Sequence, residues 1–286
     1  PQWPESWIQG ASAGIAIDKQ DNVWIIHRPA NVTEKRACCK AAPAVIEFDS
    51  TGKLLQSWNG PGEGYQWPLD GDEHGIFVDY KNNVWLSSAG GPRLRERTEN
   101  MILKFTRDGK FIFQVGKRGQ SKGSLDTENF NNAADIYVYP KTNEAFIADG
   151  YVNRRVVVLD AETGTFKRMW GAYGNVPDDK APNGPNYDGP GAQQFNLVHG
   201  VRVSEDGLVY VAERTNNRVQ VFTKQGKFVQ QFSVHPSTQS RGPKCGGPWS
   251  TTDAGCGTVY HLALSSDPQQ RYVFVADGTN NTVWIF

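Results

Sequence analysis

The sequence predicts an all-β propeller that forms a single domain over residues 1–286. The first observation behind this prediction is composition: 9 Trp, 10 Tyr and 14 Phe stand against 2 Met, together with 30 Gly and 16 Pro. Such a composition favours short aromatic-rich strands joined by many turns. The second observation is internal repetition, because one pattern of strand, turn and strand returns five times along the chain.

Each of the five modules begins with a short apolar strand that is followed by a turn and a second strand. A third strand with its own turn follows, as in ILKFTRDGKFIFQVG, where Gly supplies the positive φ that a hairpin turn needs. Each module is therefore expected to be a small antiparallel meander. The first strands read GIAID from Gly14, GIFVD from Gly75, DIYVY from Asp135, GVRVS from Gly200 and LALSS from Leu262.

The spacing of the modules leaves the number of blades open. The first strands start 61, 60, 65 and 62 residues apart, whereas a compact four-stranded blade needs roughly 40 to 45 residues. The excess lies in long Gly-, Pro- and Asn-rich loops, so the chain has five blades, or six with one unrecognised. The last module ends at TVWIF without a fourth strand, and the N-terminal ESWIQ has no module of its own. We expect this N-terminal strand to complete the last blade and close the ring.

Charge and motifs exclude several classes of partner. Lys plus Arg and Asp plus Glu both number 30, with a pI near 7.3, so there is no electrostatic case for nucleic acid. No apolar run of about 18 residues is present, so no membrane span is expected. Motifs of the G-x-G-x-x-G and P-loop types are absent. The expected partner is a small-molecule or peptide substrate at the channel mouth, and the long loops are candidate contacts for a protein.

The cysteines favour an oxidising compartment. Cys245 and Cys256 bracket a Gly/Pro/Ser/Thr loop that a disulfide would close, while Cys38 and Cys39 form either a vicinal disulfide, other pairings or two free thiols. The chain opens at Pro1 without a basic and apolar leader, which is typical of a mature terminus. We expect a secreted or periplasmic protein from which the signal peptide has been removed.

Three of the five histidines fall in one position of the repeat, directly before the innermost strand. In a propeller this position faces the central channel, where the blades converge. Neutral imidazole is a common zinc ligand, and three protein ligands with an open fourth position form the usual catalytic zinc site. Structural histidines bonded to backbone are the alternative. The aligned residues are Ala13, His74, Ala134, His199 and His261.

Three further side chains follow second strands and should border the same mouth. Antiparallel pairing places the end of the second strand beside the start of the first. Arg28, Tyr151 and Arg214 stand at such ends. A cation for a substrate carboxylate, a phenol for proton transfer and a Lewis-acid metal would together form a reactive site.

These residues resemble those of the NHL-repeat propeller lyases typified by the catalytic core of peptidyl-α-hydroxyglycine α-amidating lyase. The resemblance covers most of the chain. It is carried by GIAIDKQDNVWIIHR, DEHGIFVDYKNNVWLSS, ADGYVNRRVVVLD, LVHGVRV with VYVAERTNNRVQVF, and YHLAL with ADGTNNTVWIF.

The resemblance implies a zinc-dependent lyase that cleaves an N-acyl carbinolamine to an amide and glyoxylate. The zinc ligands would be His74, His199 and His261. Arg28 and Tyr151 match the family's catalytic arginine and tyrosine, and Arg214 matches a further channel arginine. In the family an acidic calcium ligand follows the last histidine, whereas Leu262 stands there in this chain, so a Ca²⁺ ion is less expected than Zn²⁺.

Two other functions compete with the lyase. The first is a non-enzymatic secreted propeller whose loops bind a protein or glycan and whose histidines hold a structural metal. The second is a calcium-dependent hydrolase or lactonase, which needs carboxylate ligands at the channel. Asp135 is the only acidic residue near the starts of the first strands, which disfavours the hydrolase.

Overall fold

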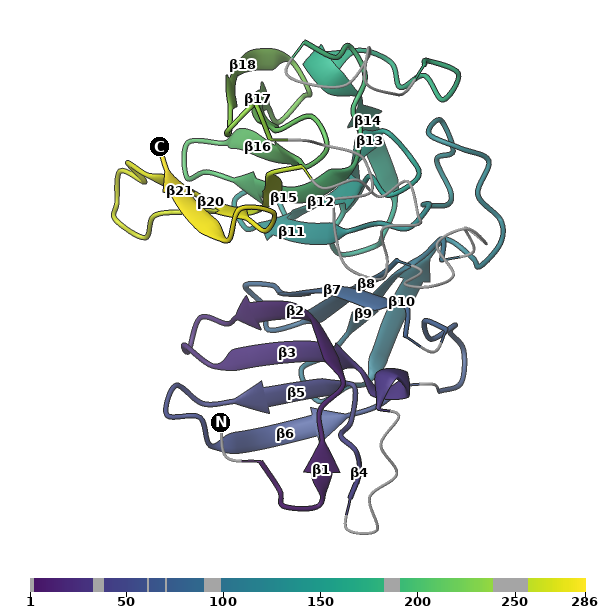
Figure 1. Ribbon diagram of the computed structural model, residues 1–286. Helices are drawn as coiled ribbons and strands as arrows, with labels where there is room; N and C mark the ends of the chain where they lie inside the picture. The colour runs from purple at the N-terminus through teal and green to yellow at the C-terminus, as the bar shows by residue number, and fades with distance from the viewer. Residues whose placement is uncertain are drawn as a thin grey trace.

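The computed structural model describes residues 3–32, 39–60, 62–69, 71–89, 99–182, 191–238 and 257–286. Five small antiparallel sheets follow one another along the chain as the blades of a β-propeller, so the predicted fold class is confirmed. Figure 1 shows them in chain order, from the purple N-terminal blade to the yellow C-terminal one.

The blades are numbered here in chain order, and the five predicted modules correspond to them one to one. Blade 1 contains β2 (Ala11–Ile17), β3 (Val23–Arg28), β5 (Val45–Phe48) and β6 (Leu54–Trp58), and blade 2 contains β7 (Glu73–Val78), β8 (Val84–Ser88), β9 (Ile102–Phe105) and β10 (Phe111–Val115). Blade 3 contains β11 (Asp135–Tyr139), β12 (Glu144–Asp149), β13 (Arg155–Asp160) and β14 (Phe166–Trp170), and blade 4 contains β15 (Val198–Val203), β16 (Leu208–Glu213), β17 (Arg218–Thr223) and β18 (Phe228–Ser233). Blade 5 contains β19 (Val259–Leu264), β20 (Val273–Asp277) and β21 (Thr282–Ile285).

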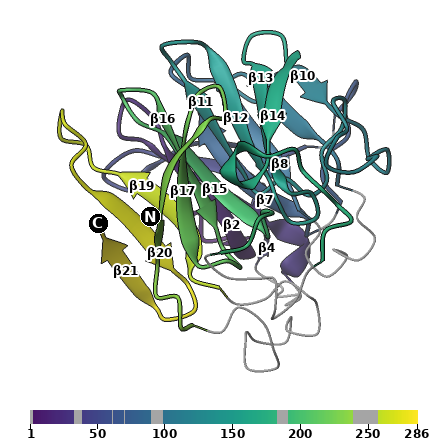
Figure 2. The same ribbon diagram turned by 90° about the horizontal axis from the view of Figure 1, so that it is seen from above.

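The first strand of each blade lies innermost. β2, β7, β11, β15 and β19 contact one another in succession, and Figure 2 shows the blades from above. Because each second strand runs antiparallel to its first strand, the ends of β3, β12 and β16 lie beside the starts of the inner strands. The sequence thus brings two sets of side chains to the same end of the channel.

Apolar side chains between successive blades form the core. Middle strands such as β12 and β13 are buried on both faces, which explains their nearly continuous apolar sequences EAFIAD and RVVVLD. Separate apolar clusters join blade 1 to blade 2, blade 2 to blade 3, blade 3 to blade 4 and blade 4 to blade 5. The core is therefore divided into layers that follow the blades.

The expectation that the N-terminal strand completes the last blade is wrong. β1 (Trp7–Ile8) pairs in parallel with β4 (Lys40–Ala41), and the last sheet contains only β19, β20 and β21 among the described residues. Trp3 and Trp7 instead pack with Phe48 against the outer part of blade 1. The packing of these two partly buried indoles ties the N-terminal segment to blade 1.

The two end blades each turn one apolar face to solvent. On β2, Ile15 is 67% exposed and Ile17 is 64% exposed, and on β21 Val283 and Ile285 are each 63% exposed. In the other blades the corresponding faces pack against a neighbouring blade. In the described part of the chain, blade 5 and blade 1 therefore do not pack face to face, and the series of blades is open between them.

Some predictions fall outside the described residues. Cys38, Cys245 and Cys256 lie outside the described residues, so the predicted Cys245–Cys256 bridge stays a prediction. Cys39 is described and is not free. No helix in the described ranges is long and apolar enough to cross a membrane.

Glu144, at the start of β12, gives blade 3 a pH-dependent contribution to stability. Its carboxylate contacts Arg168 at 2.7 Å and Lys167 at 2.8 Å. Burial alone would raise the pKa of Glu144, but the hydrogen bonds from Arg168 and Lys167 lower it to about 2. Because the pKa is lower in the folded state, the stabilisation is complete above the ordinary glutamate pKa. It is lost as the pH falls from about 4.5 towards about 2.

We therefore expect Glu144→Gln to lower the free energy of unfolding at pH 7 by about 2 kcal/mol and to flatten its decline in acid. The measurement is urea denaturation at a series of pH values between neutrality and pH 3. Glu162→Gln is the control, because its partner Lys81 and Glu162 itself are both exposed. If the free energy of unfolding fell equally in acid in wild type and in Glu144→Gln, the role assigned to the Glu144 carboxylate would be contradicted.

Candidate functional site

β-bulges at the starts of the inner strands aim side chains into the channel. In β15 the residues paired with β16 are Val198 and then Gly200, which leaves His199 as the extra residue. In β7 the pairing shifts between Glu73 and Ile76, around His74. A bulge bends the strand and redirects the side chain that it carries. A bulge at the start of the inner strand thus directs His74 in blade 2 and His199 in blade 4 towards the channel.

The two histidines meet on one phenol. The Nε2 atom of His74 lies 3.0 Å from the Tyr151 hydroxyl oxygen, and the Nε2 atom of His199 lies 2.9 Å from the same oxygen. The two imidazole rings are 5.5 Å apart between centroids. Three residues from blades 2, 3 and 4 therefore form one compact cluster.

Backbone carbonyls fix the tautomer of both imidazoles. Nδ1 of His74 bonds to the Ala134 carbonyl and Nδ1 of His199 to the Tyr260 carbonyl. A carbonyl only accepts, so each Nδ1 carries the proton. Burial and the charge of Arg28 lower the pKa of His74 to about 4, and burial, with neighbouring positive charge, holds the pKa of His199 well below its usual range. Both rings are therefore neutral at pH 7 and present bare Nε2 lone pairs.

This arrangement fits a metal ion. The Tyr151 hydroxyl has one proton and can donate it to only one of the two Nε2 atoms. The lone pair of the other Nε2 atom receives no proton from the hydroxyl, and a cation bound between the rings would satisfy it. Neutral imidazoles whose other nitrogen donates to a backbone carbonyl are the usual ligands of zinc. The donor set of His74 and His199 thus matches zinc. No group of three or more His, Cys, Asp or Glu side chains in the described ranges is already placed to hold a metal.

Two arginines make the surroundings of the phenol positive. Arg28, the last residue of β3, donates from Nε to the Glu73 carbonyl at 2.9 Å. Arg214, directly after β16, donates to the Tyr260 hydroxyl at 2.8 Å. Burial raises the pKa of Tyr151 while the two guanidinium charges oppose that rise. The predicted residues Arg28, Tyr151 and Arg214 do lie at the same mouth as His74 and His199.

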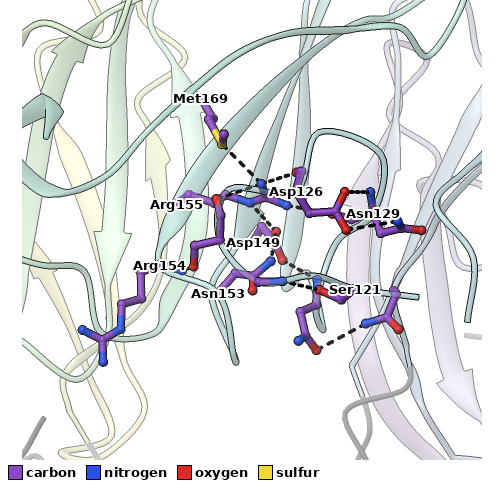
Figure 3. Close-up of polar contacts among 12 residues, drawn as sticks. Ser121, Asp126, Asn129, Asp149, Asn153, Arg154, Arg155 and Met169 are labelled. Carbon is purple, nitrogen blue, oxygen red and sulfur yellow. Dashed lines mark hydrogen bonds and ion pairs between the residues drawn. The ribbon is translucent and has the colours of Figure 1, made fainter. Parts of the chain in front are cut away.

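A buried ion pair and a hydrogen bond hold the loop that carries Tyr151. Asp149 ends β12 and Arg155 begins β13, and their side chains pair at 2.8 Å with almost no exposure. Asp149 also accepts a hydrogen bond from Asn153 at 2.8 Å. Figure 3 shows this network, in which Arg155 lies between Asp149 and the segment around Asp126. The loop from 150 to 154 is thereby clamped at both ends.

Blade 4 repeats the clamp behind Arg214. Glu213 ends β16 and pairs with Arg218 at the start of β17, and both side chains are fully buried. Burial raises the pKa of Glu213 and the Arg218 charge opposes this. Sequence reasoning missed both clamps. The signal was an acidic residue at the end of a second strand with an arginine five or six residues later.

The alignment that placed His261 with His74 and His199 is wrong by one residue. In β19 the paired residues are Val259 and His261, so the extra residue in the bulge is Tyr260. By this register His261 corresponds to Gly200 rather than to His199. The position that carries histidine in blades 2 and 4 therefore carries tyrosine in blade 5.

His261 is engaged by a different pair. Its Nε2 atom accepts a hydrogen bond from Arg202 at 2.9 Å and lies 3.3 Å from an oxygen of Asp135. Although burial alone would raise the pKa of Asp135, the charge of Arg202 and the hydrogen bond from the Val201 backbone hold it far below the usual range. The role of His261 as a third zinc ligand stays a prediction, and it requires the imidazole to leave Arg202.

Comparison with known proteins supports the repeat and the fold. A family model described as NHL repeat matches residues 195–222. Curated relatives include NHL repeat-containing protein 3 of Mus musculus, 29% identical over 231 residues that cover 78% of this chain and 55% of that protein. Peptidyl-glycine alpha-amidating monooxygenase B of Xenopus laevis is 26% identical over 246 residues, which cover 80% of this chain and 25% of that protein.

A third relative is a probable peptidyl-alpha-hydroxyglycine alpha-amidating lyase of Caenorhabditis elegans, 22% identical, with 75% of this chain and 56% of that protein covered. The chain spans about half the length of the NHL repeat-containing relatives it matches. Among solved structures, a Xanthomonas campestris gluconolactonase has a TM-score of 0.57 at 12% identity, covering 96% of this chain and 71% of that one. A Staphylococcus aureus virginiamycin B lyase has a TM-score of 0.53 at 14% identity, covering 97% and 70%. These two structures share the fold.

Proposed function

We propose that the chain is a zinc-dependent lyase of the amidating-lyase type, which cleaves an N-acyl carbinolamine such as a peptidyl-α-hydroxyglycine to an amide and glyoxylate. The observation that carries the proposal is the convergence of His74 and His199 on the Tyr151 hydroxyl, at 3.0 and 2.9 Å. The relatives named for amidating enzymes support the same reaction class.

The chain's own residues supply binding and proton transfer. Cleavage removes a proton from the substrate hydroxyl, breaks the bond between carbon and nitrogen, and adds a proton to the amide nitrogen. Tyr151 is the half-buried phenol placed to carry that proton. Arg28 and Arg214 lie beside it and stabilise a carboxylate or a developing negative charge.

His74 and His199 would hold the zinc ion, with His261 as the third ligand. A bound zinc ion would supply Lewis-acid polarisation of the substrate oxygen. The carbonyls of Ala134 and Tyr260 orient the first two imidazoles by accepting their Nδ1 protons.

The test combines metal content with turnover. Protein purified without chelator or affinity histidines should contain about one zinc per chain by mass spectrometry. His199→Ala should lose most of it, whereas His235→Ala, which alters an exposed histidine outside the channel, should not. His261→Ala shows whether the third ligand is this residue. Wild type should release glyoxylate from an α-hydroxyglycine peptide, and a chelator should abolish the release.

A chain that neither holds nor takes up zinc and releases no glyoxylate would overturn the proposal. The favoured function would then be the non-enzymatic propeller, whose loops bind a protein or glycan.

A further inference from the structure

Tyr260 takes the blade 5 position that histidine occupies in blades 2 and 4, and its ring binds Arg214 in two ways. The Arg214 guanidinium carbon lies 3.9 Å from the centroid of the Tyr260 ring. The Tyr260 hydroxyl accepts a hydrogen bond from Nη2 of Arg214 at 2.8 Å. Stacking fixes the plane of the guanidinium and the hydrogen bond fixes its rotation within that plane.

Two glycines pack closely against Tyr260 and Arg214. A Cβ atom on Gly278 would lie 2.9 Å from the Tyr260 ring, and one on Gly257 would lie 1.9 Å from the Arg214 carbonyl oxygen. Both contacts are too close for any side chain other than hydrogen. The backbone therefore packs directly against the ring of Tyr260 and against the main chain of Arg214, which limits the movement of both.

Tyr260 also connects Arg214 to the histidine cluster. Its carbonyl accepts the Nδ1 proton of His199, while its hydroxyl accepts from Arg214. One residue thus orients both an imidazole and the guanidinium beside the reacting phenol.

The potential at this position suits an anion. Arg28 ends β3 and Arg214 follows β16, so two guanidinium groups border this mouth of the channel. Two positive charges at one end of the channel attract and stabilise a carboxylate there. A planar guanidinium held in one orientation matches the two oxygens of a carboxylate.

We propose that Tyr260 is a positioning residue that holds Arg214 as the carboxylate-binding group of the channel, so that the site takes ligands that carry an α-oxygenated carboxylate. The substrate class rests on the proposed lyase function, whereas carboxylate binding can be measured without turnover.

The probe is glyoxylate, titrated into wild type, Tyr260→Phe and Arg214→Met by calorimetry. Tyr260→Phe keeps the stacked ring and removes only the hydroxyl, so it should weaken glyoxylate binding about tenfold. Arg214→Met should abolish detectable binding. The matched control is Tyr272→Phe, because Tyr272 is exposed and lies in the connection between β19 and β20. The neutral amide of glyoxylic acid should bind wild type and Tyr260→Phe equally.

Kinetics give a second readout. If Tyr260 positions Arg214, Tyr260→Phe should raise KM for an α-hydroxyglycine peptide more than it lowers kcat, and the peptide amide that lacks the carboxylate should show no such change in KM. A merely structural role would lower stability without this split.

The two proposals fail separately. Glyoxylate affinity that is the same in wild type and Tyr260→Phe, or no glyoxylate binding by wild type, overturns the role of Tyr260. Glyoxylate binding that depends on Tyr260, in a chain that cleaves no hydroxyglycine peptide, upholds that role and overturns the lyase.

Discussion

Replacing Tyr151 with phenylalanine should lower kcat on an α-hydroxyglycine peptide by about 10²- to 10⁴-fold, the range expected when a positioned general acid or base is removed. The phenol is the only group that contacts both His74 and His199 through one oxygen in the described structure. Phenylalanine keeps the ring and removes the transferable proton. The measurement is glyoxylate release under saturating substrate.

Zinc content and folding should survive the same substitution. The Nε2 atoms of His74 and His199 remain in place because their Nδ1 atoms are held by backbone carbonyls. Tyr272→Phe is the matched control, since the Tyr272 side chain is 46% exposed and lies away from the channel. Turnover that is unchanged in Tyr151→Phe, in a chain that cleaves the peptide, would show that the phenol moves no proton.

Arg155→Met should lower the free energy of unfolding by about 3–5 kcal/mol, which is typical when one partner of a buried ion pair is removed. Arg155 is 0% exposed and pairs with Asp149 at 2.8 Å. It also donates to the carbonyls of Ser124 and Asn129, at 2.9 and 2.7 Å. Methionine fills much of the volume but leaves a buried carboxylate charge and several carbonyls without their donor.

Urea denaturation followed by tryptophan fluorescence measures this effect. Arg271→Met is the matched control, because Arg271 also pairs with an acidic residue, Asp267, at 3.1 Å, but its side chain is 64% exposed. The control should change stability by less than about 1 kcal/mol. Equal effects in the two variants would mean that the clamp behind Tyr151 contributes no more than a surface pair.

The repeat pattern was sufficient to predict the propeller and most of its strands. Strand periodicity and glycine turns are local properties, so five modules could be recognised from sequence and all five are present as blades. The same reasoning placed Tyr151 and Arg214 beside His199, because antiparallel pairing fixes which strand ends share an edge.

Register at the bulges could not be read in the same way. A bulge adds one residue to one strand without any sequence marker, so counting back from the strand in β19 selected His261 when the bulged residue is Tyr260. The partner of the N-terminal strand was equally hidden. Its pairing with β4 depends on how Trp3 and Trp7 pack on blade 1, which is a tertiary contact between distant residues.

The buried ion pairs beside Tyr151 and Arg214 support the channel mouth, whereas Tyr151 and Arg214 themselves carry its proposed chemistry. In blade 3 the pair is Asp149 with Arg155, and in blade 4 it is Glu213 with Arg218. In each case the residue at the channel mouth lies between the two clamped positions in sequence, and its side chain is not part of the ion pair. In blades 3 and 4 the side chain at the mouth could therefore be exchanged, in evolution or by design, while the ion pair beneath it keeps the loop in place.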